Sequence, residues 1–407
     1  MNKISFVFPG VGSQFTGMGK ELYNEFPVFK ETIEEASDLA GTDIFKVWQD
    51  ADQKQRLNEL NFAQISLLTI SYASYRVLQA ELGIEPDMMI GHSLGEYSAL
   101  CCDGIMSFSE AIPLVQKRGE CIISAAEQLK GTMLWVINVD TQIVEQVCDQ
   151  LRQGGIEVYP SAYDTSTQCS ISCFKDDIFT IAKALEDKGA LVYPLNLSGP
   201  FHSPLMQQAA MDFEKVLDGC TFQPQTSRVI ANETAKLYSS DVKGHLTRQL
   251  VSPVKWFQSL DLLEASGVST IVEVGPKEVL TYLTQKSEKP FKAYTFNTIQ
   301  HLNTLKNDLV VAEDEYLMKI SACKGVAVAT RNYYTKNSNY QQDVVAPYRE
   351  IAKIEESIRE GREVASEQHL KQALVHLNTI LNNKRVPADI QQASLTHLLS
   401  DKFKHLV

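Results

Sequence analysis

The chain has 407 residues, of which 44% are hydrophobic and 22% are charged. This composition excludes a mainly disordered protein and suits one large domain with smaller ones. The 38 Lys and Arg residues are outnumbered by 50 Asp and Glu residues, a formal net charge of −12, and nucleic-acid binding needs clustered basic side chains, so we expect no nucleic-acid partner.

The cysteines and the apolar segments indicate a cytoplasmic protein. Eight Cys residues without a C-x-x-C pair are too few for a disulfide scaffold, so we expect reduced thiols. No uninterrupted apolar stretch approaches the roughly 20 residues that span a bilayer, so we expect no membrane partner. The first apolar run stops at Pro9, which indicates a strand rather than a secretion signal.

The first two thirds of the chain have an α/β pattern. Short apolar runs that end in Gly or Pro alternate with amphipathic segments, which predicts parallel strands joined by helices. The expected strands 4–8, 87–90 and 270–274 each run into a glycine-containing loop. Open α/β sheets bind ligands at the carboxyl ends of their strands, so we expect the functional site there.

A different order of elements occurs between residues 131 and 197. The pattern predicts strand, helix, strand, strand, helix and strand at 132–139, 141–152, 157–163, 169–173, 176–188 and 190–197. This is the order of a ferredoxin-like fold. We therefore expect residues 131–197 to form a small subdomain inserted into a large domain made of residues 1–130 and 198–300.

Residues 301–407 are expected to form a helical C-terminal extension. Apolar residues have helical spacing at 348–358, 370–381 and 388–399, whereas the polar stretch 335–343 predicts a loop. The extension could cover the core of the large domain or dock a carrier or synthase protein, and both interpretations stay open.

The sharpest local signal is Gly91-His92-Ser93-Leu94-Gly95, which lies between an expected strand and an apolar segment. A G-x-S-x-G in this context predicts a nucleophile elbow. A tight turn leaves no room for side chains at 91 and 95, and it lifts the hydroxyl of Ser93 to a helix N-terminus. Free N–H groups there stabilise negative charge.

A nucleophilic serine needs a base, and the chain has eight His residues. Five lie in the C-terminal extension, His92 is expected to point away from its neighbour Ser93, and His245 is more simply structural. His202 lies between Pro200 and Pro204, which stiffen the loop at a domain junction. It is therefore the favoured general base.

Arg118 lies on an apolar helical stripe with Ala111, Leu114, Val115 and Ile122, so its guanidinium is expected to point inward. A buried guanidinium needs a carboxylate. That carboxylate is either an internal Asp or Glu or belongs to a substrate, and the position of Arg118, one helix after Ser93, favours a substrate clamp.

Taken together, these motifs resemble the malonyl-CoA:acyl carrier protein transacylases and the related acyltransferases of polyketide synthases, including trans-acting ones. The similarity runs from residue 1 to about residue 292. It rests on Phe8-Pro9-Gly10-x-Gly12-Ser13-Gln14, Gln64, Gly91-His92-Ser93-Leu94-Gly95-Glu96, Gln116-Lys117-Arg118-Gly119, Gly199-Pro200-Phe201-His202-Ser203-Pro204-Leu205-Met206, Pro253-Val254-x-Trp256 and Glu273-Val274-Gly275-Pro276. The resemblance implies an α/β-hydrolase-like large domain with a ferredoxin-like insert.

The resemblance also implies a catalytic pair without an acidic partner. Ser93 is then the nucleophile and His202 the base, which a backbone carbonyl near Ser252 orients. The oxyanion is expected to face the backbone N–H groups of Val11 and Leu94. Val11 replaces the usual Gln, so the backbone donor is kept and any side-chain contact is lost.

For the substrate, the resemblance implies that Arg118 and Gln64 bind a malonyl carboxylate and that the Phe201 ring restricts branched groups. The expected reaction is ping-pong transfer of a malonyl-type group from CoA, through an acyl-serine, to the phosphopantetheine thiol of an acyl carrier protein. It would serve polyketide or fatty acid biosynthesis, with polyketide synthase modules as further partners. We expect no cofactor and no metal in the enzyme.

Two other functions are considered. The first is a proofreading acyl-thioester hydrolase on the same scaffold, against which Arg118 argues because simple acyl chains carry no carboxylate. The second is a scaffold subunit without activity, which the intact Ser93, His202 and Arg118 disfavour. Basic residues near the expected site mouth, Lys117, Lys255, Lys277 and Lys286, are candidates for contacting an acidic carrier.

Overall fold

The computed structural model describes residues 3–195, 199–223, 227–309, 313–334, 338–399, 403 and 406. The chain divides into two compact units, one that extends to Leu302 and one that starts at Asn303. The division falls inside helix α14 (Ile299–Leu309), two residues beyond the boundary expected from the sequence. Each unit is described by itself.

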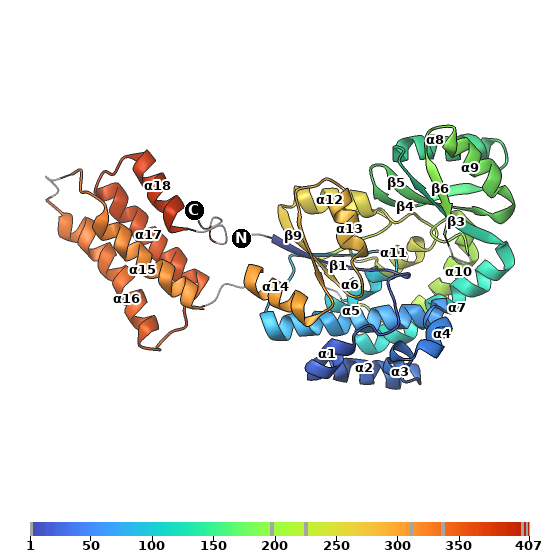
Figure 1. Ribbon diagram of the computed structural model, residues 1–407, viewed down its shortest axis with the longest axis horizontal. Coiled ribbons are helices and arrows are strands. Elements are labelled where there is room, and N and C mark those ends of the chain that lie inside the picture. The colour runs from blue at the N-terminus through green and yellow to red at the C-terminus, as the bar shows by residue number, and fades with distance from the viewer. Residues whose placement is uncertain are drawn as a thin grey trace. The chain divides into compact units, whose positions relative to one another are not determined.

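A six-stranded sheet forms the centre of the larger unit (Figure 1). Its order is β10 (Lys292–Phe296), β9 (Val268–Val274), β1 (Lys3–Phe8), β2 (Met88–Gly91), β7 (Val229–Ala231) and β8 (Lys236–Leu237). All neighbours are parallel except β7 and β8. The three strands expected from the sequence are the adjacent β9, β1 and β2, so their glycine-containing loops meet at one edge.

Helices lie on both sides of this sheet (Figure 1). On one side, α12 (Trp256–Ala265) and α13 (Val279–Lys286) pack Trp256, Leu260 and Leu280 against Ile90 and Ile271. On the other side lie α5 (Leu60–Leu82), α6 (Gly95–Cys102) and α7 (Phe108–Leu129). The remaining helices are α1 (Lys20–Glu25), α2 (Pro27–Ala40), α3 (Ile44–Gln49), η1 (Ala51–Gln53), α4 (Lys54–Leu57), η3 (Pro204–Met206), α10 (Gln207–Leu217) and α11 (Val242–Gln249).

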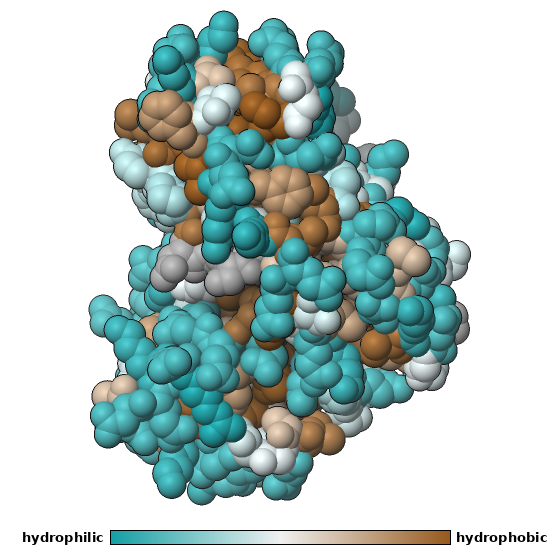
Figure 2. Space-filling view, turned by 90° about the vertical axis from the view of Figure 1, so that its right-hand side faces the viewer, coloured by the Kyte–Doolittle hydropathy of each residue, from teal (hydrophilic) through white to brown (hydrophobic). Residues whose placement is uncertain are grey.

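A second, four-stranded antiparallel sheet forms the inserted subdomain, in the order β4, β5, β3, β6. Its elements are β3 (Gly131–Ile137), α8 (Thr141–Gln153), β4 (Val158–Thr165), β5 (Gln168–Phe174), η2 (Lys175–Asp177), α9 (Ile178–Glu186) and β6 (Leu191–Pro194). The predicted ferredoxin-like order is confirmed, although residues 196 and 197 of the last expected strand lie outside the described residues. Seen from the right of Figure 1, the subdomain is the upper lobe, where hydrophobic side chains show in patches among hydrophilic ones (Figure 2).

The C-terminal unit is helical. It contains α15 (Glu313–Ala329), the π-helical turn η4 (Gln341–Val345), α16 (Ala346–Arg359), α17 (Glu367–Asn383) and α18 (Ala388–Leu398). Its core consists of buried side chains from residues 320–403, among them Ile320, Ile351 and Leu377. The expected loop at 335–343 is wrong at its end, because buried Val344 orders the chain into η4 ahead of α16; residues 335–337 lie outside the described part.

Among the described helices, none combines the length and the apolar character needed to cross a bilayer.

The separate core of the C-terminal unit generates a prediction. A chain that ends at Leu309 should fold, because the C-terminal unit has a hydrophobic core of its own among the described residues between 320 and 403. Hydrogen exchange followed by mass spectrometry should show unchanged protection of the β1 and β9 amides. Loss of that protection would instead support the interpretation that the extension covers the core of the large domain.

Candidate active site

The turn between β2 and α6 carries Ser93 in a left-handed backbone conformation, with φ of 52°. A Cβ at position 91 would lie 1.7 Å from the carbonyl carbon of Gly95, and a Cβ at position 95 would lie 2.0 Å from the carbonyl oxygen of Phe8. Both clashes are with backbone atoms, which cannot move aside as flexible side chains do. The expected need for glycine at both positions therefore has a direct steric cause, and the turn is strained at Ser93 itself.

Asn232, at the end of β7, fixes this turn from the side. Its Oδ1 accepts a hydrogen bond of 2.8 Å from the backbone N–H of Ser93, and its Nδ2 donates one of 2.6 Å to the carbonyl of Gly91. The side chain is buried. Asn232 was not predicted from the sequence, although it directly follows the short apolar run at 229–231.

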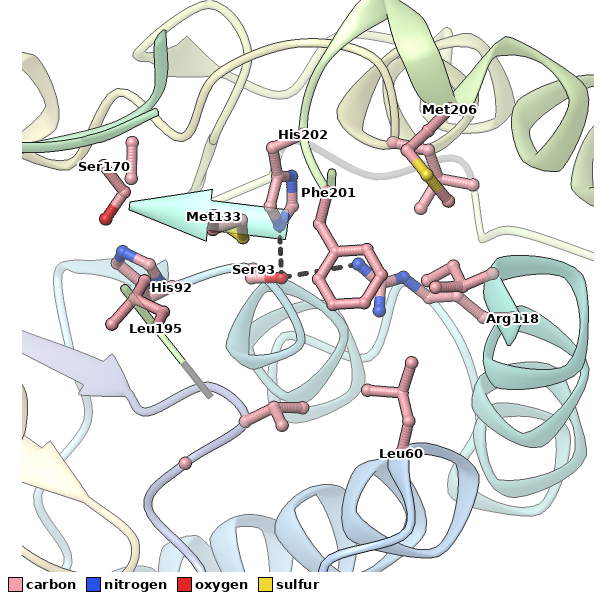
Figure 3. Close-up of a pocket in the computed structure, with 15 residues that line it drawn as sticks. Leu60, His92, Ser93, Arg118, Met133, Ser170, Leu195, Phe201, His202 and Met206 are labelled. Atoms are coloured by element: carbon pink, nitrogen blue, oxygen red, sulfur yellow. Dashed lines mark hydrogen bonds between the residues drawn. The ribbon is translucent and has the colours of Figure 1, made fainter. Parts of the chain in front are cut away.

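His202 faces Ser93 from the loop between β6 and η3 (Figure 3). Its Nε2 lies 2.7 Å from the Ser93 Oγ, and its Nδ1 lies 2.9 Å from the backbone carbonyl of Gln249. A carbonyl only accepts, so Nδ1 carries the proton and Nε2 presents a lone pair to the hydroxyl. This is the arrangement that a general base requires.

The carbonyl that orients His202 was expected near Ser252, and the structure gives the main contact to Gln249 instead. Gln249 is the last residue of α11, where carbonyls lack helical partners and the negative end of the helix dipole favours a proton on the ring. The backbone of Ser252 contributes in the same direction but less.

Burial lowers the pKa of His202 to about 3, and the nearby Arg118 charge contributes the next largest lowering. The carbonyls of Gln249 and Ser252 oppose this shift only in part, while His92 adds to it. The imidazole is therefore neutral at neutral pH, with its free nitrogen available to accept a proton.

Arg118 on α7 is 2% exposed. Its NH1 donates to the Gln64 Oε1 at 2.7 Å, and its NH2 donates to the Gln249 Oε1 at 3.0 Å and lies 3.4 Å from the Ser93 Oγ. The guanidinium also lies over the Tyr97 ring, 5.1 Å from its centroid. No carboxylate of the described residues pairs with it, so the internal ion pair considered from the sequence does not occur there, and its positive charge is not neutralised.

The backbone N–H groups of Val11 and Leu94 are the expected donors to the oxyanion. Within the part of the chain that is described, neither N–H has an intramolecular acceptor. The N–H of Gly12, the residue after Val11, donates to the Gln14 side chain. Val11 lines the same cavity as Ser93, and Leu94 directly precedes α6. The buried Nε2 of Gln64 has no hydrogen-bond partner in the described residues.

These groups open into a cavity of about 340 Å³ between the large domain and the subdomain (Figure 3). Its wall is mostly apolar and includes Phe201, with Ser93, His202 and Arg118 among its polar members. The other wall residues are Val11, Gly12, Leu60, His92, Ile122, Met133, Ala162, Ser170, Leu195, Met206 and Leu250. Val11, His92, Ser170 and Leu195 also line an adjoining cavity of about 380 Å³, which extends to α13.

The remaining predicted residues have simpler surroundings. His245 is buried and bonded to Glu233 at 2.8 Å. His92 has its Nε2 3.4 Å from the Asp164 Oδ1. Among the lysines, Lys117 pairs with Glu120 and Lys277 donates to the carbonyl of Gly12.

The chain is similar to proteins of a known family. A model of the acyl transferase domain family matches residues 5–321. The chain is 31% identical over 392 residues to a malonyl CoA-acyl carrier protein transacylase of Bacillus subtilis, covering 95% of this chain and 98% of the relative. It is 38% identical over 295 residues to a transacylase of the same name from Bacillus subtilis strain 168, covering 72% of this chain and 92% of that relative.

The chain is also similar to solved structures of malonyl transacylases. A malonyl-transacylase in complex with its type II polyketide synthase acyl-carrier protein has a TM-score of 0.71 and 34% identity to this chain, covering 75% of this chain and 100% of that one. The alignment with the first Bacillus subtilis relative is long enough to include most of the C-terminal unit.

The close backbone contacts at the turn predict the effect of adding a methyl group at Gly91. Gly91→Ala should lower the free energy of unfolding by at least about 3 kcal/mol, the upper end for overpacking, because its Cβ would lie within 2.0 Å of three backbone atoms of the Gly95–Glu96 peptide. Gly219→Ala, which would make only an ordinary contact of 3.6 Å, is the matched control and should change it by less than about 1 kcal/mol. Equal effects in urea unfolding would refute the steric account.

The surroundings of His202 predict how it titrates. The ring should take up no proton as pH falls through about 6.5, the ordinary value for histidine, because burial and Arg118 lower its pKa to about 3. The unfolded chain does take up that proton, so stability from this group is lost as pH falls below about 6.5. An NMR titration of the folded protein with a His202 midpoint near 6.5 would contradict this.

Proposed function

The chain belongs to the family of malonyl CoA-acyl carrier protein transacylases, and we propose that it transfers a malonyl group from coenzyme A to the thiol of an acyl carrier protein. The observation that carries the proposal is the guanidinium of Arg118, which has no carboxylate partner in the described residues and lies 3.4 Å from the Ser93 Oγ. In a malonyl thioester, one methylene separates the carboxylate from the reacting carbonyl. A cation beside the nucleophile suits that spacing.

The first half of the reaction forms an ester on Ser93. The neutral His202 Nε2 takes the Ser93 proton while the Oγ attacks the thioester carbonyl. The N–H groups of Val11 and Leu94 then stabilise the oxyanion. When the carbon–sulfur bond breaks, His202 returns the proton to the CoA thiolate, and the malonyl group stays on Ser93.

In the second half, the thiol of the carrier gives its proton to His202 and attacks the ester, and the Ser93 alkoxide takes the proton back. A malonyl carboxylate on Arg118 assists the first half because it neutralises the charge that contributes to lowering the pKa of His202. The substrate that fits the cavity thereby also makes the base stronger.

For the biosynthetic context, we propose that the enzyme serves polyketide synthase carriers. Val11 in place of the usual Gln and the C-terminal helical unit support this proposal over a fatty acid enzyme. A panel of holo acyl carrier proteins from both kinds of pathway tests it: faster transfer to a fatty acid carrier than to every polyketide carrier would overturn it. A water-accepting proofreading hydrolase would release malonate without any carrier.

Arg118→Ala tests the clamp. Acylation of Ser93 by malonyl-CoA, read by intact-protein mass, should fall about 100-fold, because hydrogen bonds to a charged group are worth about 1.5–3 kcal/mol each. Acylation by acetyl-CoA should fall less than about 3-fold.

The control is Arg248→Ala, which removes a guanidinium on α11 that pairs with Glu233 and Asp241 and leaves the cavity unchanged. It should keep both rates. An equal loss for the two acyl groups in Arg118→Ala would count against a carboxylate clamp, and a Ser93 that forms no malonyl ester in the wild type would refute the proposed function.

A further inference from the structure

A buried carboxylate, Glu96, lies behind the reactive residues and takes no part in the steps above. It is in the first turn of α6, three positions after Ser93, and is fully buried. Its Oε2 accepts a hydrogen bond of 2.5 Å from the side-chain Nε2 of Gln249. Its Oε1 accepts from the Tyr238 hydroxyl at 2.5 Å and from the Asn232 N–H at 3.2 Å.

The neighbours of Glu96 define the orientation of the Gln249 amide. Its Nε2 donates both to Glu96 and to the carbonyl of Ser93, at 2.9 Å. Its Oε1 is therefore turned toward Arg118. Rotated by half a turn, the amide would place its NH2 against the guanidinium, two donors facing each other with no acceptor between them.

The Gln249 NH2 and the Asn232 N–H can only donate, and the Tyr238 hydroxyl donates in this arrangement, so the carboxyl group accepts all three hydrogen bonds. The arrangement is therefore that of the ionised form. Burial nevertheless raises the pKa of Glu96 to about 7, with the three hydrogen bonds opposing the shift. The orientation of the Gln249 amide thus depends on a carboxylate whose charge is only marginally maintained near neutral pH.

We propose that Glu96 is a positioning residue for substrate specificity, because it fixes the side-chain amide of Gln249 and through it the guanidinium of Arg118 beside Ser93. The proposal rests on the proposed malonyl transfer. The guanidinium donates to two side-chain amides, those of Gln64 and Gln249. Glu96 fixes the orientation of the second. His202 uses the backbone carbonyl of Gln249, which does not depend on the amide.

The test is a comparison of two acyl donors in Glu96→Gln, a nearly isosteric change that places an NH2 among donors. We expect kcat/KM for malonyl-CoA to fall about tenfold or more, mainly through KM, whereas kcat/KM for acetyl-CoA falls less than about threefold. Tyr238→Phe, assayed above neutral pH, is the matched control. It removes a hydrogen bond to the same carboxylate from the side away from Gln249 and should leave the malonyl-to-acetyl ratio unchanged.

A second variant shows whether Glu96 acts through Gln249. Gln249→Leu keeps the backbone carbonyl that orients His202 and loses the amide, so it should lower the same ratio. The double variant should then lower the ratio no further than Gln249→Leu does alone. Additive losses, or equal losses for both donors in Glu96→Gln, would overturn the inference. If the wild type forms no malonyl ester, the proposed function fails instead.

The inference can also be tested on the wild-type enzyme, which does not depend on a variant that folds. Protonation of Glu96 frees the amide to turn, so the malonyl-to-acetyl ratio should fall as pH drops through about 7. The other ionisable groups around Glu96 are Tyr238, Tyr97, His245 and, across Gln249, Arg118. The His245 charge lowers the pKa of Glu96 slightly, so His245→Gln should keep the pH dependence of the ratio and move its midpoint upward; a ratio independent of pH would contradict the inference.

Discussion

The site depends on one buried guanidinium whose hydrogen bonds go to amides. A fully buried charge is costly to leave without an opposite charge, and Arg118 is held by Gln64 and Gln249 through side-chain oxygens that carry only partial charge. The amides orient the guanidinium without neutralising it. Under the proposed function, the carboxylate of the acyl group supplies the missing opposite charge. Without it, the same guanidinium contributes to lowering the pKa of His202.

The ends of secondary-structure elements place several groups of the site, whereas Arg118 and Gln64 lie within helices α7 and α5. Ser93 follows the end of β2, Asn232 follows the end of β7, and Gln249 ends α11. Ser93 and His202 both have left-handed backbone conformations, with φ of 52° and 56°. Such strain persists only where the surroundings over-determine it, and here Asn232, Gln249 and the packed glycines supply that constraint.

The sequence predicted the parts of the fold that depend on local pattern. Strand ends at glycine, the ferredoxin-like order and the inward-facing Arg118 were all visible in residue spacing. Helix α5 was missed because it is buried on nearly every side, from Phe62 to Leu78, and has little amphipathic periodicity. Helix α15 was missed because exposed Met318 and Val328 interrupt its buried stripe.

Contacts between distant segments could not be predicted from the chain. Gln249 meets Ser93 across 156 positions, and Asn232 meets it across 139. A neutral amide carries no motif, and nothing in local spacing distinguishes Gln249 from Ser252 as the carbonyl that faces His202. The charged and nucleophilic residues were visible because their chemistry is rare in a core, and Gln64 was named through the family resemblance, whereas the amides of Gln249 and Asn232 were not predicted.

A structure of the protein with a malonyl ester on Ser93 tests the central claim most directly. The account predicts that the free carboxylate of the ester lies against the guanidinium of Arg118, within hydrogen-bond distance, and that the ester carbonyl oxygen faces the N–H groups of Val11 and Leu94. A carboxylate turned toward solvent, with Arg118 still bonded only to its two glutamines, would contradict it.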